Sequence, residues 1–153
     1  MIKIIQAKKQ HIPELVTLFE AYRAFYKKEP NLQKATQFLE DRIISKESFV
    51  FVAIDDEHKM IGFVQLYPMF SSTRLDKFLV LNDLFVVAEA RGKGISKLLI
   101  DRSKLLAKDY NALELVLETQ KTNTIGNKLY PQEGFELDTE HNYYSWINPE
   151  YHV

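Results

Sequence analysis

The chain contains no cysteine among its 153 residues, and this absence excludes several classes of chemistry. Disulfide bonds, thiolate metal sites and a cysteine nucleophile are all ruled out together. A cysteine-free chain also fits a reducing compartment, so we expect the protein to be cytoplasmic. The four histidines are scattered without the spacing of metal ligands, and the sequence therefore predicts no metal site.

An excess of charge of either sign is lacking too, since 20 basic residues face 21 acidic ones. Such a chain has no global field that would draw it to nucleic acid or to an acidic membrane. Basic and aromatic residues do not interleave as they do in single-strand binders. No apolar run approaches the ~20 residues that span a bilayer, and the N-terminus has no signal-peptide core. We therefore expect neither a nucleic-acid nor a membrane partner.

Linkers, internal repeats and low-complexity tracts are also missing. Hydrophobic residues make up 46% of the chain and charged residues 27%, which is the balance of an ordinary globular protein. The length suits one domain with a sizeable buried core. We therefore expect a single domain that covers residues 1–153.

The spacing of the apolar residues predicts alternating strands and helices. Asn31 is expected to cap the second helix, and Pro68 to close the third strand. Strands are expected at residues 1–7, 49–54, 61–67, 78–87, 113–117 and in the tail sequence NYYSWI, with one more left open around Phe135. Helices are expected from residue 12 to before Pro30, and at about 32–43, 95–105 and 123–132. This order predicts an α/β fold of the α+β kind, with a mixed central sheet flanked by about four helices.

A glycine-containing junction, RGKGIS at residues 91–96, lies between a strand and a helix. The first N–H groups of a helix lack intrahelical partners, and glycine lets a ligand approach the backbone closely. Together with Arg91 and Lys93, these groups suit a phosphate or a pyrophosphate. The alternative is a turn that uses glycine only for its torsion angles. The spacing fits neither a P-loop nor a dinucleotide-binding fingerprint.

These residues resemble a known family. The sequence VVAEARGKGISKLLI is similar to the Arg-x-x-Gly-x-Gly/Ala segment of the GNAT superfamily of N-acetyltransferases, with Ser96 in place of the last Gly/Ala. A second segment, NTIGNKLYPQEGFE at residues 123–136, resembles the Asn-x-x-Ala-x-x-Leu-Tyr-x-x-x-Gly-Phe segment of that family, with Gly126 in place of Ala. The two segments occur in the order that the family requires, so the resemblance covers essentially the whole chain.

The resemblance implies acetyl-CoA as cosubstrate and assigns roles to particular residues. Tyr130 matches the general acid that protonates the CoA thiolate. Pro131 follows it directly and is expected to bend the segment of residues 123–136. The resemblance also implies that backbone groups on the edge of one strand contact the thioester and the pantetheine of CoA. It implies further that the backbone amides of the glycine loop bind the pyrophosphate. The residues so assigned to CoA are Leu84, Phe85, Val86, Arg91, Gly92, Lys93, Gly94, Ile95, Ser96, Lys97 and Asn123. Asn123 is also expected to cap its helix.

The strand LNDLFV at residues 81–86 is similar to that of diamine acetyltransferases. Asp83 matches an acid of those enzymes, whereas Asn82 replaces a glutamate that often acts as the base there. Asp83 is interpreted as the group that binds the substrate ammonium or relays its proton, with a structural hydrogen bond as the alternative. Glu118 is a second candidate base.

The resemblance further implies direct transfer to the primary amine of a small molecule, polyamine-like or an amino sugar. The acceptor pocket is expected in the region of residues 22–34. Acetylation of a protein amine and a non-catalytic acyl-CoA-binding module are the alternative functions. The tail NYYSWI is expected either to form a dimer through a shared strand or to close the sheet of its own chain.

Overall fold

The computed structural model describes residues 1–152 and divides into two compact units, Met1–Glu118 and Thr119–Val153. The first unit holds five strands and three α-helices, and the second holds one α-helix among its described residues. That the two units form one domain over residues 1–153 stays a prediction. Among residues 1–152, no helix is both long enough and apolar enough to cross a membrane.

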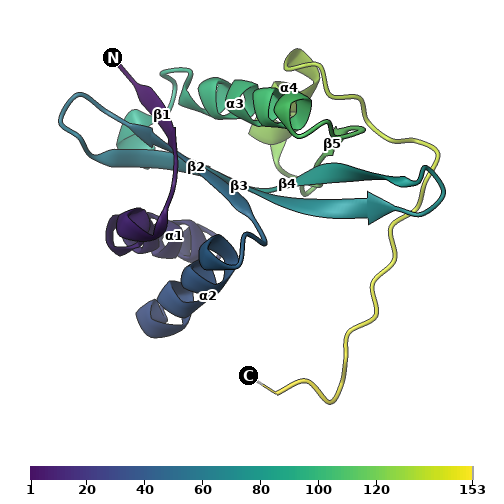
Figure 1. Ribbon diagram of the computed structural model, residues 1–153, viewed down its shortest axis with the longest axis horizontal. Coiled ribbons are helices and arrows are strands. Elements are labelled where there is room, and N and C mark those ends of the chain that lie inside the picture. The colour runs from purple at the N-terminus through teal and green to yellow at the C-terminus, as the bar shows by residue number, and fades with distance from the viewer. Residues whose placement is uncertain (153) are drawn as a thin grey trace. The chain divides into compact units, whose positions relative to one another are not determined.

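The first unit is built on a five-stranded sheet with the order β1-β2-β3-β4-β5 (Figure 1). Neighbouring strands from β1 to β4 are antiparallel, whereas β4 and β5 are parallel, so the predicted mixed sheet is confirmed. The strands are β1 (Lys3–Gln6), β2 (Phe49–Ile54), β3 (Met60–Ser71), β4 (Asp76–Val86) and β5 (Leu115–Val116). The α-helices are α1 (Ile12–Phe25), α2 (Leu32–Ile44) and α3 (Ile95–Asp109), with short 3-10 turns at Lys9–His11 and Ala88–Ala90.

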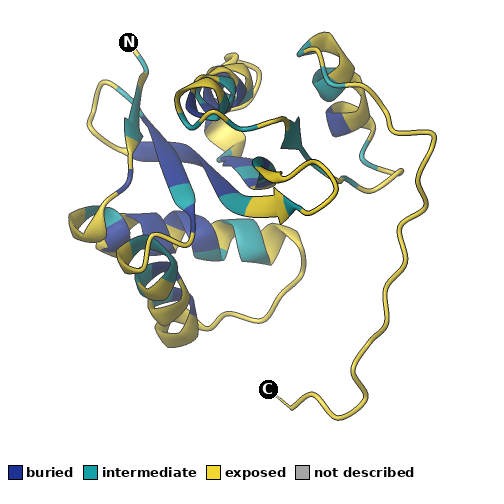
Figure 2. Ribbon diagram, turned by 45° about the vertical axis from the view of Figure 1, so that its right-hand side comes forward, coloured by how far each residue is buried: buried dark blue, intermediate teal, exposed yellow. Residues whose placement is uncertain are grey.

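Helices cover both faces of this sheet. In Figure 1, α1 and α2 lie on one face and α3 lies on the other. Figure 2 shows that the middle strands and the inner faces of these helices are buried. As expected, Asn31 caps α2, because its side chain accepts a hydrogen bond from the N–H of Lys34 at 3.0 Å. The core between α1, α2 and the sheet includes Leu15, Phe19, Leu39 and Phe63, all of which are buried.

Four strands differ in length from the expectation, and β3 and β5 show why. β3 continues through Pro68 to Ser71, and because its pairing with β2 ends at Leu66, Pro68 lies opposite a residue of β4 only. Proline is tolerated in such an edge segment, since the missing N–H would have no partner on the open side. β5 is limited to two residues because its pairing with β4 is confined to Leu79 and Val80.

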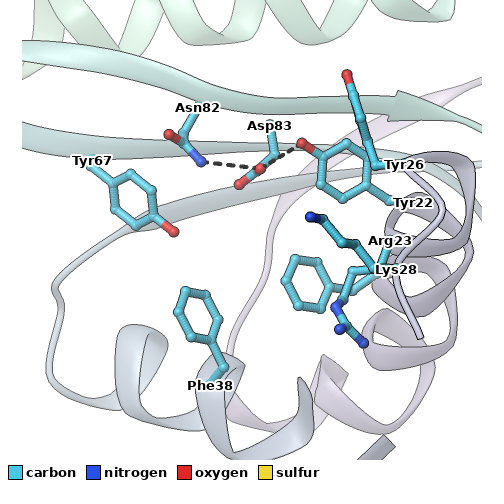
Figure 3. Close-up of a pocket in the computed structure, with 9 residues that line it drawn as sticks. Tyr22, Arg23, Tyr26, Lys28, Phe38, Tyr67, Asn82 and Asp83 are labelled. Atoms are coloured by element: carbon cyan, nitrogen blue, oxygen red, sulfur yellow. Dashed lines mark hydrogen bonds between the residues drawn. The ribbon is translucent and has the colours of Figure 1, made fainter. Parts of the chain in front are cut away.

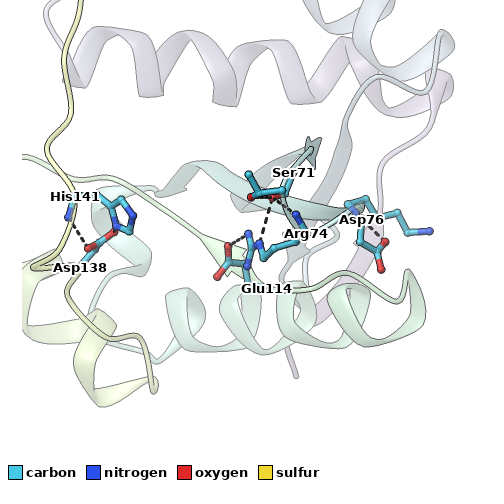
Figure 4. A network of polar contacts seen from close by, with 8 residues as sticks. Ser71, Arg74, Asp76, Glu114, Asp138 and His141 are labelled. Carbon is cyan, nitrogen blue, oxygen red and sulfur yellow. Dashed lines mark hydrogen bonds and ion pairs between the residues drawn. The ribbon is translucent and has the colours of Figure 1, made fainter.

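An ion pair connects the turn of the long β3–β4 hairpin to the residue before β5. Figure 4 shows that Arg74 in the turn forms an ion pair with Glu114, and that its Nε donates to the Ser71 hydroxyl at 3.3 Å. The Glu114 carboxylate beside it raises the pKa of the Arg74 guanidinium. The backbone oxygen of Glu114 in turn accepts from the N–H of Leu79 at 3.0 Å. The turn therefore helps to place β5 beside the outer half of β4.

The second unit contains α4 (Thr124–Gln132), which begins and ends with well-defined caps. The C-terminal cap is a Schellman motif: the N–H of Phe135 donates to the oxygen of Tyr130, the N–H of Gly134 donates to that of Pro131, and Gly134 is left-handed. The expected strands at NYYSWI and around Phe135 are wrong, since no described residue after Gln132 is in a strand. Alternating apolar residues make a strand only where a neighbouring strand supplies hydrogen-bond partners, and this segment has none among the described residues.

Candidate active site

A β-bulge in β4 shapes the candidate site. Gln65 of β3 lies opposite Asp83, but the next residue, Leu66, lies opposite Leu81, so Asn82 is an extra residue in β4. In a regular strand, adjacent side chains point to opposite faces of the sheet. The bulge instead lets Asn82 lie beside Asp83, and its Nδ2 donates to Asp83 Oδ1 at 3.1 Å. Two neighbouring polar side chains therefore reach the same place.

Asp83 is a buried carboxylate that accepts three hydrogen bonds. The hydroxyl of Tyr22 on α1 donates to Oδ1 at 2.8 Å, and Nε2 of Gln65 donates to Oδ2 at 2.8 Å. The third donor is Asn82, and Asp83 itself is only 6% exposed. An ionised carboxylate has about four acceptor positions. One position therefore remains for a further donor.

Asp83 forms part of the wall of a cavity of about 280 Å³ between α1, α2 and β4 (Figure 3). Five of its lining residues are aromatic: Phe19, Tyr22, Tyr26, Phe38 and Tyr67. Arg23, Lys28 and Asn82 complete the lining. An ammonium group is attracted both to a carboxylate and to the faces of aromatic rings. The chemistry of this cavity therefore suits a small cation, and its position agrees with the expected pocket at residues 22–34.

Burial and the charge of Asp83 keep the neighbouring phenols neutral. Burial, followed by the nearby Asp83 carboxylate, raises the pKa of Tyr22 far above its usual range. The same two causes raise the pKa of Tyr67 to about 12. Tyr22 therefore stays a hydrogen-bond donor to Asp83 at every physiological pH. Its ring is held in place by Phe63 and Phe85, at centroid distances of 5.5 and 5.9 Å.

The two cations in the lining are not equivalent. Arg23 NH1 pairs with Glu20 Oε1 at 2.5 Å, and the carboxylate of Glu20 also accepts from the N–H of Asn31 at 2.7 Å. Although burial opposes it, hydrogen bonds from Arg23 and Asn31 hold the pKa of Glu20 below its usual range. The charge of Arg23 is thus largely balanced within the protein. Lys28 lies exposed at the rim, after the end of α1.

Beyond the bulge, one edge of β4 is open. The N–H of Val87 donates to Ile61 on β3, and backbone groups along a strand alternate between its two sides. The backbone groups of Leu84 and Val86 therefore face away from β3, on the side where β5 pairs only with Leu79 and Val80. Phe85 directs its backbone toward β3. β5 therefore does not pair with this part of β4, where the resemblance implied contacts with the thioester and pantetheine.

The side chain of Arg91 connects the glycine loop to the end of β4. Its Nε donates to the oxygen of Val86 at 2.9 Å, and its guanidinium lies 5.4 Å from the ring centroid of Phe25 and 5.8 Å from that of Phe85. The side chain thus positions the loop. Lys93 is exposed within the loop, and Lys97 forms an ion pair with Asp101 at 3.6 Å.

The loop at residues 92–96 has the geometry of an anion cradle. Gly92 and Gly94 have φ values of +75° and +76°, and a Cβ added to either would meet nothing within 4 Å. The backbone is therefore open to an approaching group, and a side chain there would be strained rather than blocked. Ile95 is the first residue of α3 and its side chain is buried, so it offers only its N–H group to this space. The N–H group of Ser96 likewise belongs to the first turn of α3, where N–H groups lack intrahelical partners. Unpaired N–H groups at a helix start suit an anionic group such as a pyrophosphate.

In the second unit, Asn123 and Tyr130 lie on the same helix. Asn123 Oδ1 accepts from the N–H of Gly126 at 3.0 Å, so the predicted cap is confirmed. A Cβ at Gly126 would lie 2.5 Å from the Asn123 side chain and 3.2 Å from the Tyr130 ring, which explains why glycine replaces the alanine of the family pattern. Tyr130 is held by the Schellman motif, and its ring packs on Phe135 at 5.8 Å. Pro131 falls in the last turn of α4, where it leaves this cap intact.

Several residues of the site were not found by sequence reasoning. Gln65 and Ser48 form the buried support of Asp83, and Tyr67 lines the cavity. The one available signal was a glutamine inside the apolar run MIGFVQLY, because a polar side chain in a central strand must be satisfied there. The bulge at Asn82 had no signal, since it depends on the register between strands. Among residues 1–152, no three His, Asp or Glu side chains are grouped as a metal site.

Comparison with known proteins identifies the class. Residues 15–135 match the model of the acetyltransferase (GNAT) family, and the chain therefore belongs to this family. Because acetyltransferases of this family take their acetyl group from acetyl-CoA, the protein is an acyltransferase enzyme.

Individual relatives agree with this class. The uncharacterized N-acetyltransferase YhfO of Bacillus subtilis is 40% identical over 138 residues, which cover 90% of this chain and 92% of that protein. A protein of Haemophilus influenzae named "Probable acetyltransferase" is 34% identical, with the same coverage. A crystal structure of a probable acetyltransferase superposes with a TM-score of 0.92 at 34% identity and covers 97% of this chain and 99% of its own.

Proposed function

We propose that this acetyltransferase moves the acetyl group of acetyl-CoA onto the primary amine of a small molecule by direct attack. The observation that carries the proposal is the Asp83 carboxylate, which is buried in the wall of an aromatic cavity and keeps one acceptor position unused. At neutral pH most primary amines are ammonium ions, and this site offers both a countercharge and ring faces to such a group.

The cavity dimensions support a small acceptor. A volume of about 280 Å³ lies near the lower end of the range for small-molecule sites. We propose a polyamine-like molecule or an amino sugar. The positive charge of Lys28 at the rim repels other cations, so it favours acceptors whose further positive charges lie away from this rim.

The proposed chemistry needs two proton movements. Acetyl-CoA supplies a thioester, whose C–S bond breaks as the bond between the amine nitrogen and the carbonyl carbon forms. The ammonium group must lose one proton before attack, and we assign its acceptance to Asp83, directly or through water. A second proton leaves the nitrogen as the amide forms, and Tyr130 supplies one to the departing sulfur, so one proton is released overall. Asn82, which cannot act as a base, holds Asp83 instead. Glu118 stays the second candidate base.

We propose that the backbone of Leu84 and the N–H group of Val86 orient the thioester, because they face the open edge of β4, whereas the oxygen of Val86 already accepts from Arg91. The amides of residues 92–97 would hold the pyrophosphate, with Lys93 adding charge. Asn123 is proposed to contact CoA in addition to capping α4.

The test is a thiol-release assay with acetyl-CoA and a panel of spermidine, glucosamine, free amino acids and peptides with free amino termini. We expect release with the polyamine or the amino sugar and an acetylated amine in the mass spectrum. The N,N-dimethyl analogue of the best acceptor is the matched control: it keeps the charge, cannot form the amide, and should inhibit competitively. Release with peptides alone would contradict the small-molecule acceptor, and release with no amine would contradict the proposed reaction.

We further propose that the protein is a homodimer held by the tail. Tyr143, Tyr144, Trp146 and Ile147 are each at least 80% exposed. Burying such a side chain is worth about 1.5–3 kcal/mol, so four of them favour a partner. In a dimer, the tail of one copy would pair with the outer edge of β5 in the other copy. β5 is the last strand of the sheet, so this edge can accept another strand.

The dimer is tested by light scattering coupled to size-exclusion chromatography. We expect the mass of two chains, and of one chain for Trp146→Glu. Phe70→Glu is the control, because it introduces the same charge at an aromatic residue that is 78% exposed on β3. A monomeric unsubstituted protein at micromolar concentration would rule the dimer out. We also propose a cytoplasmic location, which the cysteine-free composition supports.

A further inference from the structure

A chain of buried polar side chains crosses three strands behind Asp83. The hydroxyl of Ser48, just before β2, donates to Oε1 of Gln65 on β3 at 2.9 Å. Nε2 of Gln65 then donates to Oδ2 of Asp83 on β4 at 2.8 Å. Ser48 is 7% exposed, and Gln65 is fully buried. Solvent therefore has almost no access to this part of the network.

The sheet register explains why the three side chains meet. Val50 lies opposite Gln65, and Gln65 lies opposite Asp83. Side chains two residues apart on a strand point to the same face, so Ser48 shares the face of Val50. All three polar groups thus face α1 and α2, where the cavity lies.

The amide of Gln65 is held in one orientation. Ser48 donates to its oxygen, and this leaves the NH₂ group directed at the carboxylate. The Asp83 carboxylate can only accept hydrogen bonds, whereas the Ser48 hydroxyl can donate or accept, so a reversed amide would place its oxygen against Asp83 and lose this hydrogen bond. Gln65 itself does not line the cavity, so any effect on a ligand passes through Asp83.

We propose that Gln65 and Ser48 are positioning residues of the transferase site: Ser48 holds the amide oxygen of Gln65 in place, and Gln65 holds the Asp83 carboxylate with its remaining acceptor position toward the acceptor amine. Figure 3 shows the result, with Asp83 directed into the space between the α1 side chains, Phe38 and Tyr67. This inference rests on the proposed function for its kinetic consequence, whereas its effect on Asp83 can be measured without turnover.

Other polar and charged groups also surround Asp83. The polar and charged groups that face it or line the same cavity are Tyr22, Arg23, Tyr26, Lys28, Tyr67 and Asn82, with Arg42 acting on Tyr67 from α2. None of these is changed by a substitution at Gln65. A change in the titration of Asp83 in such a variant is therefore attributable to the lost or altered amide.

The first measurement is the titration of the Asp83 carboxyl carbon by NMR. Removing a donor from a carboxylate disfavours its charged form, so Gln65→Met should raise the midpoint relative to the unsubstituted protein. Gln65→Glu should raise it by about one unit or more, because two carboxyl groups at hydrogen-bond distance share one proton. Gln37→Glu is the matched control, since the Gln37 amide donates to Asp41 at 2.8 Å on the exposed side of α2.

The second measurement is steady-state kinetics with the best amine acceptor. Gln65→Met should lower kcat/KM for the amine by at least about tenfold, in keeping with the loss of a hydrogen bond to a charged group, and Ser48→Ala should lower it in the same direction. The Kd for acetyl-CoA should not change, and Ser48→Thr should keep activity because it keeps the hydroxyl.

The outcomes separate the two proposals. An Asp83 midpoint that is the same in folded Gln65→Met as in the unsubstituted protein would overturn the positioning role, whatever the activity. Full kcat/KM in both Gln65→Met and Ser48→Ala would overturn its kinetic consequence while leaving the transferase function in place. An unsubstituted protein that acetylates no amine would overturn the proposed function, and the NMR titration would still decide the role of Gln65.

Discussion

A Gly94→Asp variant is expected to bind acetyl-CoA about 30-fold more weakly than a Gly94→Asn variant. Gly94 has a φ of +76° and open space beside it, and Asn and Asp are the side chains that best tolerate this left-handed conformation. The two variants therefore share their shape and backbone strain and differ in one negative charge. At roughly 7 Å from a pyrophosphate, that charge costs about 2 kcal/mol, which is about 30-fold in Kd.

Isothermal titration with acetyl-CoA gives the two dissociation constants, and thermal unfolding of both variants checks that their folds are equally stable. Raising the salt concentration should narrow the difference, because the repulsion is screened. Equal affinity of the Asp and Asn variants would mean that no phosphate lies at the loop of residues 92–96. The glycines would then serve only the turn between β4 and α3.

The second large effect is expected at Asp83. Asp83→Asn should lower kcat/KM for the amine acceptor by about 100-fold or more, because it removes both the countercharge and the proton acceptor. The new NH₂ group would also face donors from Tyr22, Gln65 or Asn82, where the carboxylate offers only acceptors. The Kd for acetyl-CoA should stay within about twofold, since Asp83 lies in the acceptor cavity.

Asp76→Asn is the matched control, because Asp76 begins the same strand and is exposed. It should leave kcat/KM unchanged. Asp83→Glu is a further comparison: it keeps the charge but lengthens the side chain in a closely packed site, and we expect intermediate activity. A folded Asp83→Asn protein with full kcat/KM would remove Asp83 from the mechanism and direct attention to Glu118.

The order of most elements and the place of the glycine loop could be predicted from the amino-acid sequence. Periodicity located α1, α2, α3 and most strands, because it reflects which side of a segment is buried. The glycines at positions 92 and 94 indicated a backbone that must turn with positive φ, and both positions have it. Asn31 and Asn123 were recognisable as caps because capping is a contact over three residues. All of these features depend on residues close together in the chain.

The cavity beside Asp83, by contrast, is built by contacts between segments far apart in the chain. The bulge at Asn82 depends on the register between β3 and β4, and the residue pattern of β4 alone does not predict it. The donors to Asp83 come from Tyr22, Gln65 and Asn82, which lie on α1, β3 and β4. The tail is rich in residues that favour strands, such as Tyr143, Tyr144 and Trp146, yet its described residues form none, because a strand requires partners that the residue pattern cannot supply. Local interactions can be predicted from residues that are neighbours in the chain. A buried carboxylate and its hydrogen-bond donors come together only when distant segments pack against one another.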